Sequence, residues 1–304
     1  NVSADGGTIK LDGNYPVGIQ NVALGDTALD SVQSGGNYNV AIGHGSLTAN
    51  TTGDDNSAVG RSSLTSNTTG IQNTAIGKSS AEANTTGDSN TSIGRHSLLS
   101  NTTGSNNTSL GTQALSANTT ASSNTAVGYR ASHDNTTGTR NVSMGSDAMY
   151  QTTTGNDLVG IGNEALTRNT TGSSNVAIGK EALSRNTTAS NNTAVGYQAG
   201  YANTTGDANV YLGRKAGYTG TTARLNTFVG DEAGGLITSG QQNVYMGNDS
   251  GYSTTTGSYN VALGASALVS NTTASNNTAV GAAALLANTT GLRNTAIGTN
   301  ALDA

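Results

Sequence analysis

The sequence predicts an all-β protein: a β-solenoid (β-roll) of about seventeen 17-residue rungs that associates as a parallel homotrimer. Three observations predict this fold class. A glycine recurs every 17 residues, an aliphatic residue or Met precedes it, and a turn such as Asn169-Thr170-Thr171-Gly172 joins successive units. Only the first interval is 18 residues long, and a turn near Gly35 and Gly36 can absorb the extra residue. The anchor glycines are Gly25, Gly43, Gly60, Gly77, Gly94, Gly111, Gly128, Gly145, Gly162, Gly179, Gly196, Gly213, Gly230, Gly247, Gly264, Gly281 and Gly298.

The composition excludes several classes of protein. Hydrophobic residues make up 33% of the chain, fewer than in ordinary globular proteins. Disordered chains share this feature but are usually highly charged, whereas charged residues are only 10% here. The net charge of −5 includes no basic stripe, and there is no cysteine and no long apolar run. We therefore expect no nucleic-acid partner, no membrane insertion and no disulfide.

The elements of one unit follow from its residues. Residues 175–179 alternate β-branched and small side chains, which is typical of a strand. Gly179 permits the bend that ends the strand, because glycine accepts positive φ. Residues 180–185 are predicted as a second strand, with a short helical turn as the alternative, and the Asn-Thr-Thr-Gly segment has the chemistry of a corner. A 17-residue period is too short for helical repeats, so stacked short strands remain.

Stacking of the units predicts columns of equivalent side chains. Rungs about 4.8 Å apart would extend roughly 80 Å over the array. The residues before the anchors, such as Ile42, Val59 and Ile76, and the Leu column four positions after them, such as Leu47, are predicted to form a thin core. Asn residues four positions before the anchors are predicted to bond neighbouring backbones and each other.

Three successive units exchange a large residue for a small one at two positions. The residue two before the anchor is normally Ala or Ser but is aromatic here, and the residue four after the anchor is glycine instead of Leu. Because close-packed interiors conserve volume locally, we expect these two columns to touch. Gly200 lacks the aromatic partner, since Ala194 stands two positions before its anchor, but Tyr201 follows it. The three pairs are Tyr211 with Gly217, Phe228 with Gly234, and Tyr245 with Gly251.

The homotrimer is predicted from the two faces of the strand. The Ala/Ser column and the aliphatic column face opposite sides, because successive strand residues alternate. If both are buried, a single narrow coil covers one face and another copy covers the other. We expect the Ala/Ser column to allow this close approach; an exposed Ala column on a monomeric solenoid is the alternative.

Two sequence motifs resemble known repeat families. Val176-Ala177-Ile178-Gly179 followed by Ala182, and the similar segment 40–43 followed by Ser46, resemble the head-domain repeats of trimeric autotransporter adhesins. Residues 192–199 are similar to repeat arrays of many phage tail-fibre and microbial surface proteins. The resemblance extends from residue 18 to the C-terminus. It implies a trimeric left-handed β-roll with an adhesive or fibre role.

Two sets of residues are candidate sites. Clustered tyrosines are candidate glycan contacts, because exposed aromatic groups often mark binding surfaces; void filling after the loss of Leu is the alternative. Each Asn-Thr-Thr is formally an N-glycosylation acceptor, but glycans about 4.8 Å apart would collide, so an Asn ladder or turn cap is the alternative. The tyrosines are Tyr197, Tyr201, Tyr218 and Tyr252. The acceptors are Asn50, Asn67, Asn84, Asn101, Asn118, Asn135, Asn169, Asn186, Asn203, Asn271 and Asn288.

The expected function is structural. His44, His96 and His133 lie in separate units without metal-ligand spacing, so we expect no catalytic residue, no cofactor and no metal. Residues 1–17 are predicted as an N-terminal cap and residues 18–304 as one continuous array. We expect a non-enzymatic shaft or adhesive fibre segment, extracellular, on a cell surface or on a virion. Its partners would be further copies of itself and a cell-surface glycan or host receptor. The alternatives are a self-assembling extracellular filament subunit and a glycan-binding or ice-binding solenoid.

Overall fold

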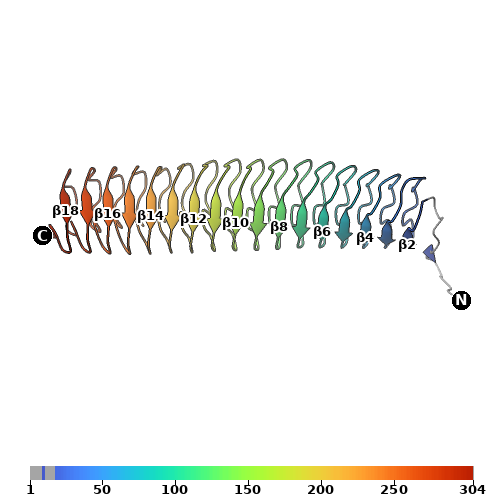
Figure 1. The fold of residues 1–304 in the computed structure, drawn as a ribbon, viewed down its shortest axis with the longest axis horizontal. Helices are drawn as coiled ribbons and strands as arrows, with labels where there is room; N and C mark the ends of the chain where they lie inside the picture. Colours follow the sequence, from blue (N-terminus) through green and yellow to red (C-terminus); the bar gives the residue numbers. More distant parts are fainter. Residues whose placement is uncertain (1–8, 11–17, 304) are drawn as a thin grey trace. The chain divides into compact units, whose positions relative to one another are not determined.

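The chain folds into short β-strands joined by turns and bends. The computed structural model describes residues 9–10 and 18–303. All regular secondary structure in that part is β-strand, divided between two compact units, residues 1–154 and 155–304 (Figure 1). Each unit is a stack of parallel strands, which confirms the predicted β-solenoid. The predicted cap, residues 1–17, lies outside the described residues except for Ile9–Lys10.

The strands are three residues long apart from the first. The first unit contains β1 (Ile9–Lys10), β2 (Val22–Leu24), β3 (Val40–Ile42), β4 (Ser57–Val59), β5 (Thr74–Ile76), β6 (Thr91–Ile93), β7 (Thr108–Leu110), β8 (Thr125–Val127) and β9 (Val142–Met144). The second contains β10 (Val159–Ile161), β11 (Val176–Ile178), β12 (Thr193–Val195), β13 (Val210–Leu212), β14 (Thr227–Val229), β15 (Val244–Met246), β16 (Val261–Leu263), β17 (Thr278–Val280) and β18 (Thr295–Ile297).

The strands pair in the register that the repeat predicts. Ile42 pairs with Val59 and Val59 with Ile76, so equivalent residues form columns. β1 is the exception and pairs antiparallel with β2. In the 18-residue unit, Asn21 Nδ2 donates to the carbonyl of Gly36, 15 residues on, whereas Asn39 reaches a carbonyl 14 residues on. The extra residue is therefore absorbed in the turn that ends at Gly36, as predicted.

The segment after the anchor glycine is turn, not strand. Residues 180–185 form consecutive turns, so the predicted second strand and its helical alternative are both wrong. The physical reason is a left-handed backbone at two positions: φ is 58° at Glu181 and 47° at Leu183. Backbone bonds still run from rung to rung on this side, since Leu183 N donates to Ala199 O at 3.0 Å.

The core lies between the middle strand residue and the Leu column. Ala41 and Leu47 are fully buried, and so are most of their equivalents. The residue before the anchor, predicted as core, lies on the outer face: Ile76 retains 41% of its surface and Ile178 retains 37%. That part of the prediction is wrong, because the small residue faces inward and its neighbours must face outward. The Ala/Ser column is therefore enclosed, and cannot provide the predicted contact with another copy.

Inward serines are paired with one another across rungs. Ser92 Oγ lies 2.7 Å from Ser80 Oγ, and Ser109 Oγ lies 2.7 Å from Ser97 Oγ. In each pair, one serine is the middle strand residue and the other follows the preceding anchor by three positions. A buried hydroxyl needs a partner, and where the corresponding strand residue is Ala58, Ser46 Oγ donates instead to the carbonyl of its own anchor, Gly43, at 2.9 Å.

The predicted contact between the aromatic and glycine columns is confirmed. A Cβ on Gly234 would lie 2.6 Å from Cε2 of Phe228, and Gly217 and Gly251 meet Tyr211 and Tyr245 in the same way. The rings also stack on each other, with 5.0 Å between the centroids of Phe228 and Tyr245. Gly200, which has no aromatic partner in its own unit, faces Tyr211 of the next rung: a Cβ on Gly200 would lie 2.5 Å from Cδ2 of Tyr211.

Two columns of asparagine run along the stack. In the column before the strands, Asn90 Nδ2 donates to Asn73 Oδ1 at 3.1 Å and to the carbonyl of Gly104 at 2.9 Å. In the Asn-Thr-Thr column, Asn84 Nδ2 donates to Asn67 Oδ1 at 2.9 Å and to the carbonyl of Gly87 at 3.0 Å. The predicted Asn ladders are therefore present, and they satisfy buried backbone groups at the corners of each rung.

Candidate functional site

The most distinctive surface feature of the second unit is a column of tyrosines five positions after the anchors. Four successive rungs place Tyr201, Tyr218, Gly235 and Tyr252 there. Tyr201 and Tyr218 stack, with ring centroids 5.3 Å apart and an interplanar angle of 14°. The third rung has no ring, and Tyr252 leans over its glycine: a Cβ on Gly235 would lie 2.8 Å from Cε2 of Tyr252.

The missing ring leaves a hollow of about 170 Å³ in this surface. Lys215 Nζ lies 5.3 Å from the centroid of the Tyr218 ring. One rung further on, at the position equivalent to Lys215, the Glu232 carboxylate is 3.0 Å from a guanidinium nitrogen of Arg214. The hollow therefore combines aromatic walls with one charged group of each sign. Its lining residues are Lys215, Tyr218, Thr219, Glu232, Gly235, Leu236 and Tyr252.

Arg214 holds the acidic side of this surface in place. Its Nε lies 2.7 Å from Asp231 Oδ1, in addition to the contact with Glu232. Hydrogen bonding to Asp231 raises the pKa of Arg214 above its ordinary value, so the guanidinium stays charged. Glu232 is thus oriented by a permanent cation, while its exposed side faces the hollow.

Tyr197 does not belong to the tyrosine column. It follows its anchor by one position rather than five, and its side chain is 43% exposed. Within the described rungs, no ring contact joins it to the other predicted tyrosines. The structure therefore places three of the four candidate tyrosines on one column.

A second aromatic cluster lies in the first unit, where the sequence analysis predicted no site. The Arg130 guanidinium lies 4.8 Å from the ring centroids of both Tyr129 and Tyr150. It also pairs with Asp147 at 2.7 Å, while His133 stacks on Tyr150 with 5.2 Å between centroids. These groups pack against each other.

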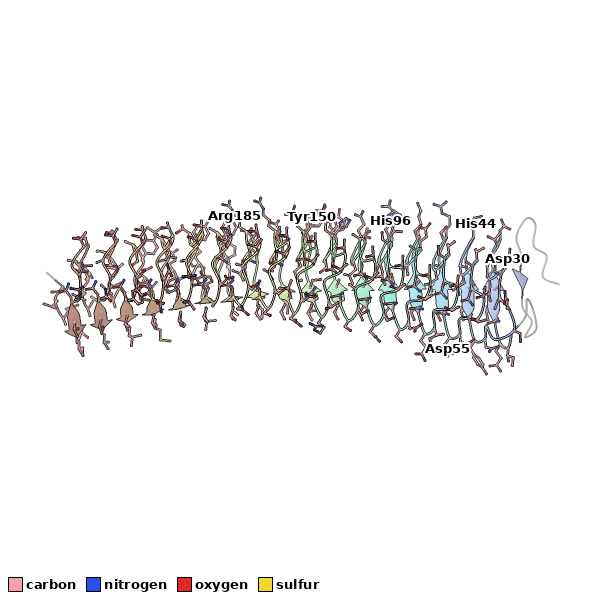
Figure 2. The ribbon with its side chains drawn as sticks, turned by 90° about the horizontal axis from the view of Figure 1, so that it is seen from above. Asp30, His44, Asp55, His96, Tyr150 and Arg185 are labelled. Carbon is pink, nitrogen blue, oxygen red and sulfur yellow. The ribbon has the colours of Figure 1, made fainter. Side chains whose placement is uncertain are left out.

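His96 lies in a shallow hollow of about 480 Å³ on the first unit. Partial burial lowers the pKa of His96, and the nearby cations of Arg95 and Lys78 lower it further, against the opposing effect of Glu82. Figure 2 shows His44, His96 and Tyr150 on one side of this unit and Asp55 on the opposite side. The hollow is lined by Ser66, Glu82, Ala83, His96, Leu99 and Ser100.

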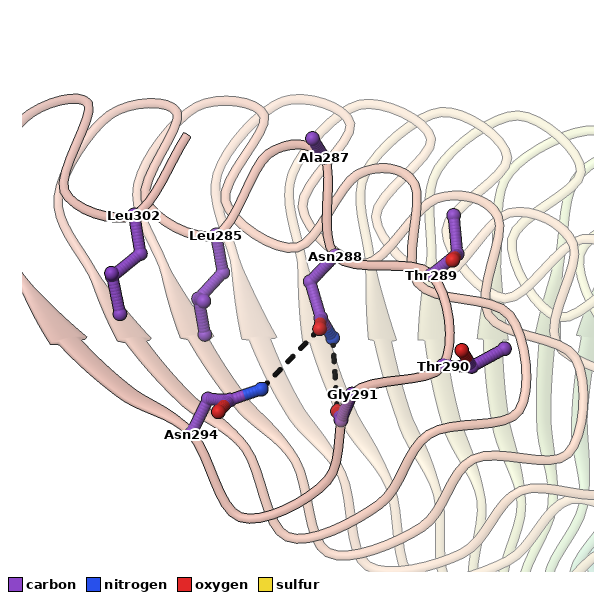
Figure 3. Close-up of a pocket in the computed structure, with 8 residues that line it drawn as sticks. All are labelled: Leu285, Ala287, Asn288, Thr289, Thr290, Gly291, Asn294 and Leu302. Carbon is purple, nitrogen blue, oxygen red and sulfur yellow. Dashed lines mark hydrogen bonds between the residues drawn. The ribbon is translucent and has the colours of Figure 1, made fainter. Parts of the chain in front are cut away.

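A third hollow, of about 350 Å³, lies at residues 285–302 (Figure 3). Asn288 Nδ2 donates to Gly291 O at 3.1 Å, and Asn294 Nδ2 donates to Asn288 Oδ1 at 3.3 Å. Leu285 and Leu302 belong to the Leu column. In the other rungs the next rung fills this space, so we assign no ligand to it.

The glycosylation acceptors form the inner Asn-Thr-Thr ladder. Ten of the eleven are buried, and Asn288 is half-buried. Asn101 is typical: its Nδ2 donates to Asn84 Oδ1 at 2.7 Å and to Gly104 O at 2.9 Å. A glycan on this nitrogen would have to break both bonds and leave the interior, so N-glycosylation of the folded chain stays an unsupported prediction.

The two successive threonines of the Asn-Thr-Thr segments, which the ice-binding alternative would need as a flat array, have different environments. Thr68 Oγ1 donates to the carbonyl of Thr85 at 3.1 Å, while Thr69 is exposed. Among the described residues, no group of three or more His, Asp or Glu side chains is placed to hold a metal ion. None of the elements found in residues 9–10 and 18–303 is a helix of the length and hydropathy needed to cross a bilayer.

Comparison with known protein families, curated proteins and solved structures finds no match for this chain. The site is therefore interpreted from its own geometry. The sequence does carry a signal for the tyrosine column: tyrosine recurs at 17-residue spacing and is interrupted once, by Gly235.

Proposed function

We propose that this chain is a non-enzymatic structural segment, a shaft or adhesive fibre segment of an extracellular appendage on a cell surface or a virion. The supporting observation is that every side of a rung is bonded to its neighbours. Around one rung, Gly77 N donates to Val59 O at 2.8 Å, Ala83 N to Leu99 O at 3.0 Å, and Thr91 N to Asn107 O at 2.8 Å.

This bonding pattern suits a spacer. Each rung interacts with the rungs directly before and after it, so stability is a sum of neighbour terms and length can grow without a larger core. Several of the strictly repeated residues make these contacts: the anchor glycine, the Ala or Ser three positions after it, and the asparagine four positions before it. Much of the repeated sequence is thus explained by stacking.

We also propose a parallel homotrimer, formed through the outer strand face rather than the Ala/Ser column. In each unit, the outer strand face consists of the first and third residues of its parallel strands, β2–β9 in the first unit and β10–β18 in the second. Its third residues are mostly aliphatic and half-exposed, for example Ile93 at 37% and Leu212 at 45%. Monomeric proteins rarely expose continuous apolar patches of more than a few hundred Å², and a repeat of identical period on another copy would match this face rung for rung.

The test is sedimentation velocity on the whole chain, with negative-stain microscopy. Lysines at Ile76 and Ile93 place two charges on the outer strand face, and Thr103→Lys adds a charge at an exposed turn position as the control. We expect the wild type and Thr103→Lys to be trimers, and Ile76→Lys/Ile93→Lys to be a monomer with an unchanged circular dichroism spectrum. A monomeric wild type rejects the trimer, and open-ended fibres favour the filament subunit instead.

A further inference from the structure

We propose that the hollow over Gly235 is a binding site for one neutral pyranose residue of a glycan. The hollow is lined by Tyr218 and Tyr252, and the rung between them carries Gly235 in place of a ring. The volume of about 170 Å³ is below the roughly 300–1,000 Å³ of sites for drug-sized ligands. It matches a single six-membered ring. This assignment does not depend on whether the chain is a shaft.

The neighbouring tyrosines show why the ligand enters at this rung. Tyr201 and Tyr218 stack with 5.3 Å between centroids, so no further ring fits between them. Arg185 continues this stack, 4.7 Å from the Tyr201 ring. Tyr218 is therefore held in place on one side, and the glycine in the next rung leaves its other side facing the hollow. A wall that is already ordered loses little entropy when a ligand binds.

The charges around the hollow favour a neutral ligand. Lys215 lies 5.3 Å from the Tyr218 ring and would repel a cation that approached the same ring. Glu232, held at 3.0 Å by Arg214, would repel an anion. Neither ionic class of ligand is therefore favoured.

The polar groups and the rings match the two surfaces of a sugar. Lys215 Nζ donates hydrogen bonds and the Glu232 carboxylate accepts them. Thr219 Oγ1 donates to Ile237 O at 2.7 Å and keeps its lone pairs to accept another. Sugar hydroxyls require both donors and acceptors, whereas the apolar C–H face of a pyranose packs against aromatic rings. A nucleobase would use the rings but would leave most of these polar groups without partners.

The experiment is saturation-transfer NMR on the whole chain with four sugars: methyl β-glucopyranoside, methyl α-mannopyranoside, methyl β-galactopyranoside and N-acetylglucosamine. Uridine and tetramethylammonium are measured in the same way as a nucleobase and a cation. Gly235→Tyr restores the missing ring and fills the hollow, and Tyr252→Ala removes one wall. Tyr259→Ala, at a tyrosine that is 57% exposed elsewhere on the same unit, is the matched control. Circular dichroism verifies that each variant is folded.

We expect at least one pyranoside to bind with a Kd on the order of 1 mM. We expect its affinity to fall at least tenfold in Gly235→Tyr and in Tyr252→Ala, and to be unchanged in Tyr259→Ala. The assignment is overturned if none of the four sugars shows saturation transfer, or if Gly235→Tyr binds as the wild type does. It is also overturned if uridine or tetramethylammonium binds more tightly than every pyranoside. None of these results bears on the oligomeric state measured by sedimentation.

Discussion

Tyr211 and Tyr245 occupy the same inward column, two rungs apart, but their hydroxyls differ. Tyr245 Oη lies 3.1 Å from Thr254 Oγ1, whereas the buried Tyr211 Oη has no hydrogen-bond partner in the protein. Burial raises the pKa of both phenols above the ordinary range, so both stay neutral. The pair separates the effect of burying a ring from the effect of satisfying its hydroxyl.

Removing the hydroxyl of Tyr211 and removing that of Tyr245 should therefore have opposite effects on the free energy of unfolding. We expect Tyr211→Phe to increase the free energy of unfolding by about 1 kcal/mol, because an unsatisfied buried group is removed. Tyr245→Phe should decrease it by about 1 kcal/mol, because the buried hydrogen bond from Tyr245 Oη to Thr254 Oγ1 is lost. Urea unfolding followed by circular dichroism measures both. A loss of stability in Tyr211→Phe as large as that in Tyr245→Phe would show that the Tyr211 hydroxyl is satisfied in solution.

His96 should make the folded chain less stable in mild acid. Its pKa is lowered from the ordinary 6.5, chiefly by partial burial and then by Arg95 and Lys78. As the pH falls through 6.5, the unfolded chain binds a proton before folded His96 does, so the free energy of unfolding decreases until folded His96 is protonated as well. We expect NMR titration to give His96 a pKa below the ordinary 6.5, and His96→Gln to remove this part of the pH dependence. A measured His96 pKa of 6.5 or above would contradict the prediction.

At the scale of the rung, the shared space of the aromatic column and the glycine column can be tested by exchanging the large and the small residue. Phe228→Ala should cost about 3–5 kcal/mol, because it leaves a cavity in the column. Gly234→Leu should also destabilise, because its side chain collides with Phe228; its backbone can accept Leu, since φ is 59° at Gly234 and 53° at Leu268. We expect the double variant Phe228→Ala/Gly234→Leu to recover most of the lost stability in urea unfolding. Additive losses would mean that the two positions do not share one space.

At most anchor glycines, a substitution would introduce both backbone strain and a collision with the next rung. Gly247 and Gly298 allow these two effects to be measured separately. Gly247 has φ of 133°, and a Cβ there would lie 2.6 Å from the carbonyl carbon of Gly264. Gly298 has φ of 123°, but a Cβ there would meet Ala301 Cβ at 4.0 Å. We expect Gly298→Ala to cost about 1–3 kcal/mol from strain alone, and Gly247→Ala to cost clearly more in the same unfolding assay. Equal costs would show that the next rung yields to the added methyl group.

The elements show which parts of a rung could be predicted from sequence and why. The strand, the register and the Asn ladders depend on periodicity and side-chain chemistry, and they are found as predicted. The side that the strand turns inward was predicted wrongly, because Ala41 and Ile42 alternate and hydrophobicity favours the larger residue. The width of the rung decides which strand residue faces inward, because its interior has room for only a small side chain opposite Leu47. The left-handed turns at residues such as Leu183 escaped prediction because Leu rarely adopts φ of 47°.

At the scale of the whole molecule, the sequence could predict which type of residue forms the candidate site, but not where its hollow lies. The tyrosines drew attention because aromatic residues are scarce in this chain, at 4%. Their column could be derived from the 17-residue spacing, which separates Tyr197 from Tyr201, Tyr218 and Tyr252. The hollow could not be derived, because it depends on the direction in which Tyr252 leans and on the ion pair that holds Glu232. Those are side-chain conformations, which a repeat pattern does not specify.

A stack built from neighbour contacts should tolerate the loss of a whole rung but not of part of one. Deleting residues 61–77 from the first unit joins Gly60 to Lys78 and leaves each column in register, because 17 residues separate equivalent positions. We expect an unchanged circular dichroism spectrum and an unfolding enthalpy lower by about 12 kcal/mol, at roughly 0.7 kcal/mol per residue removed. Deleting only residues 61–69 shifts every later side chain of the unit relative to those before it, so cooperative unfolding should be lost in calorimetry. If the 17-residue deletion were as damaging as the 9-residue deletion, the rungs would not be equivalent, and the stability of the unit would depend on a particular rung rather than on the repeated contacts.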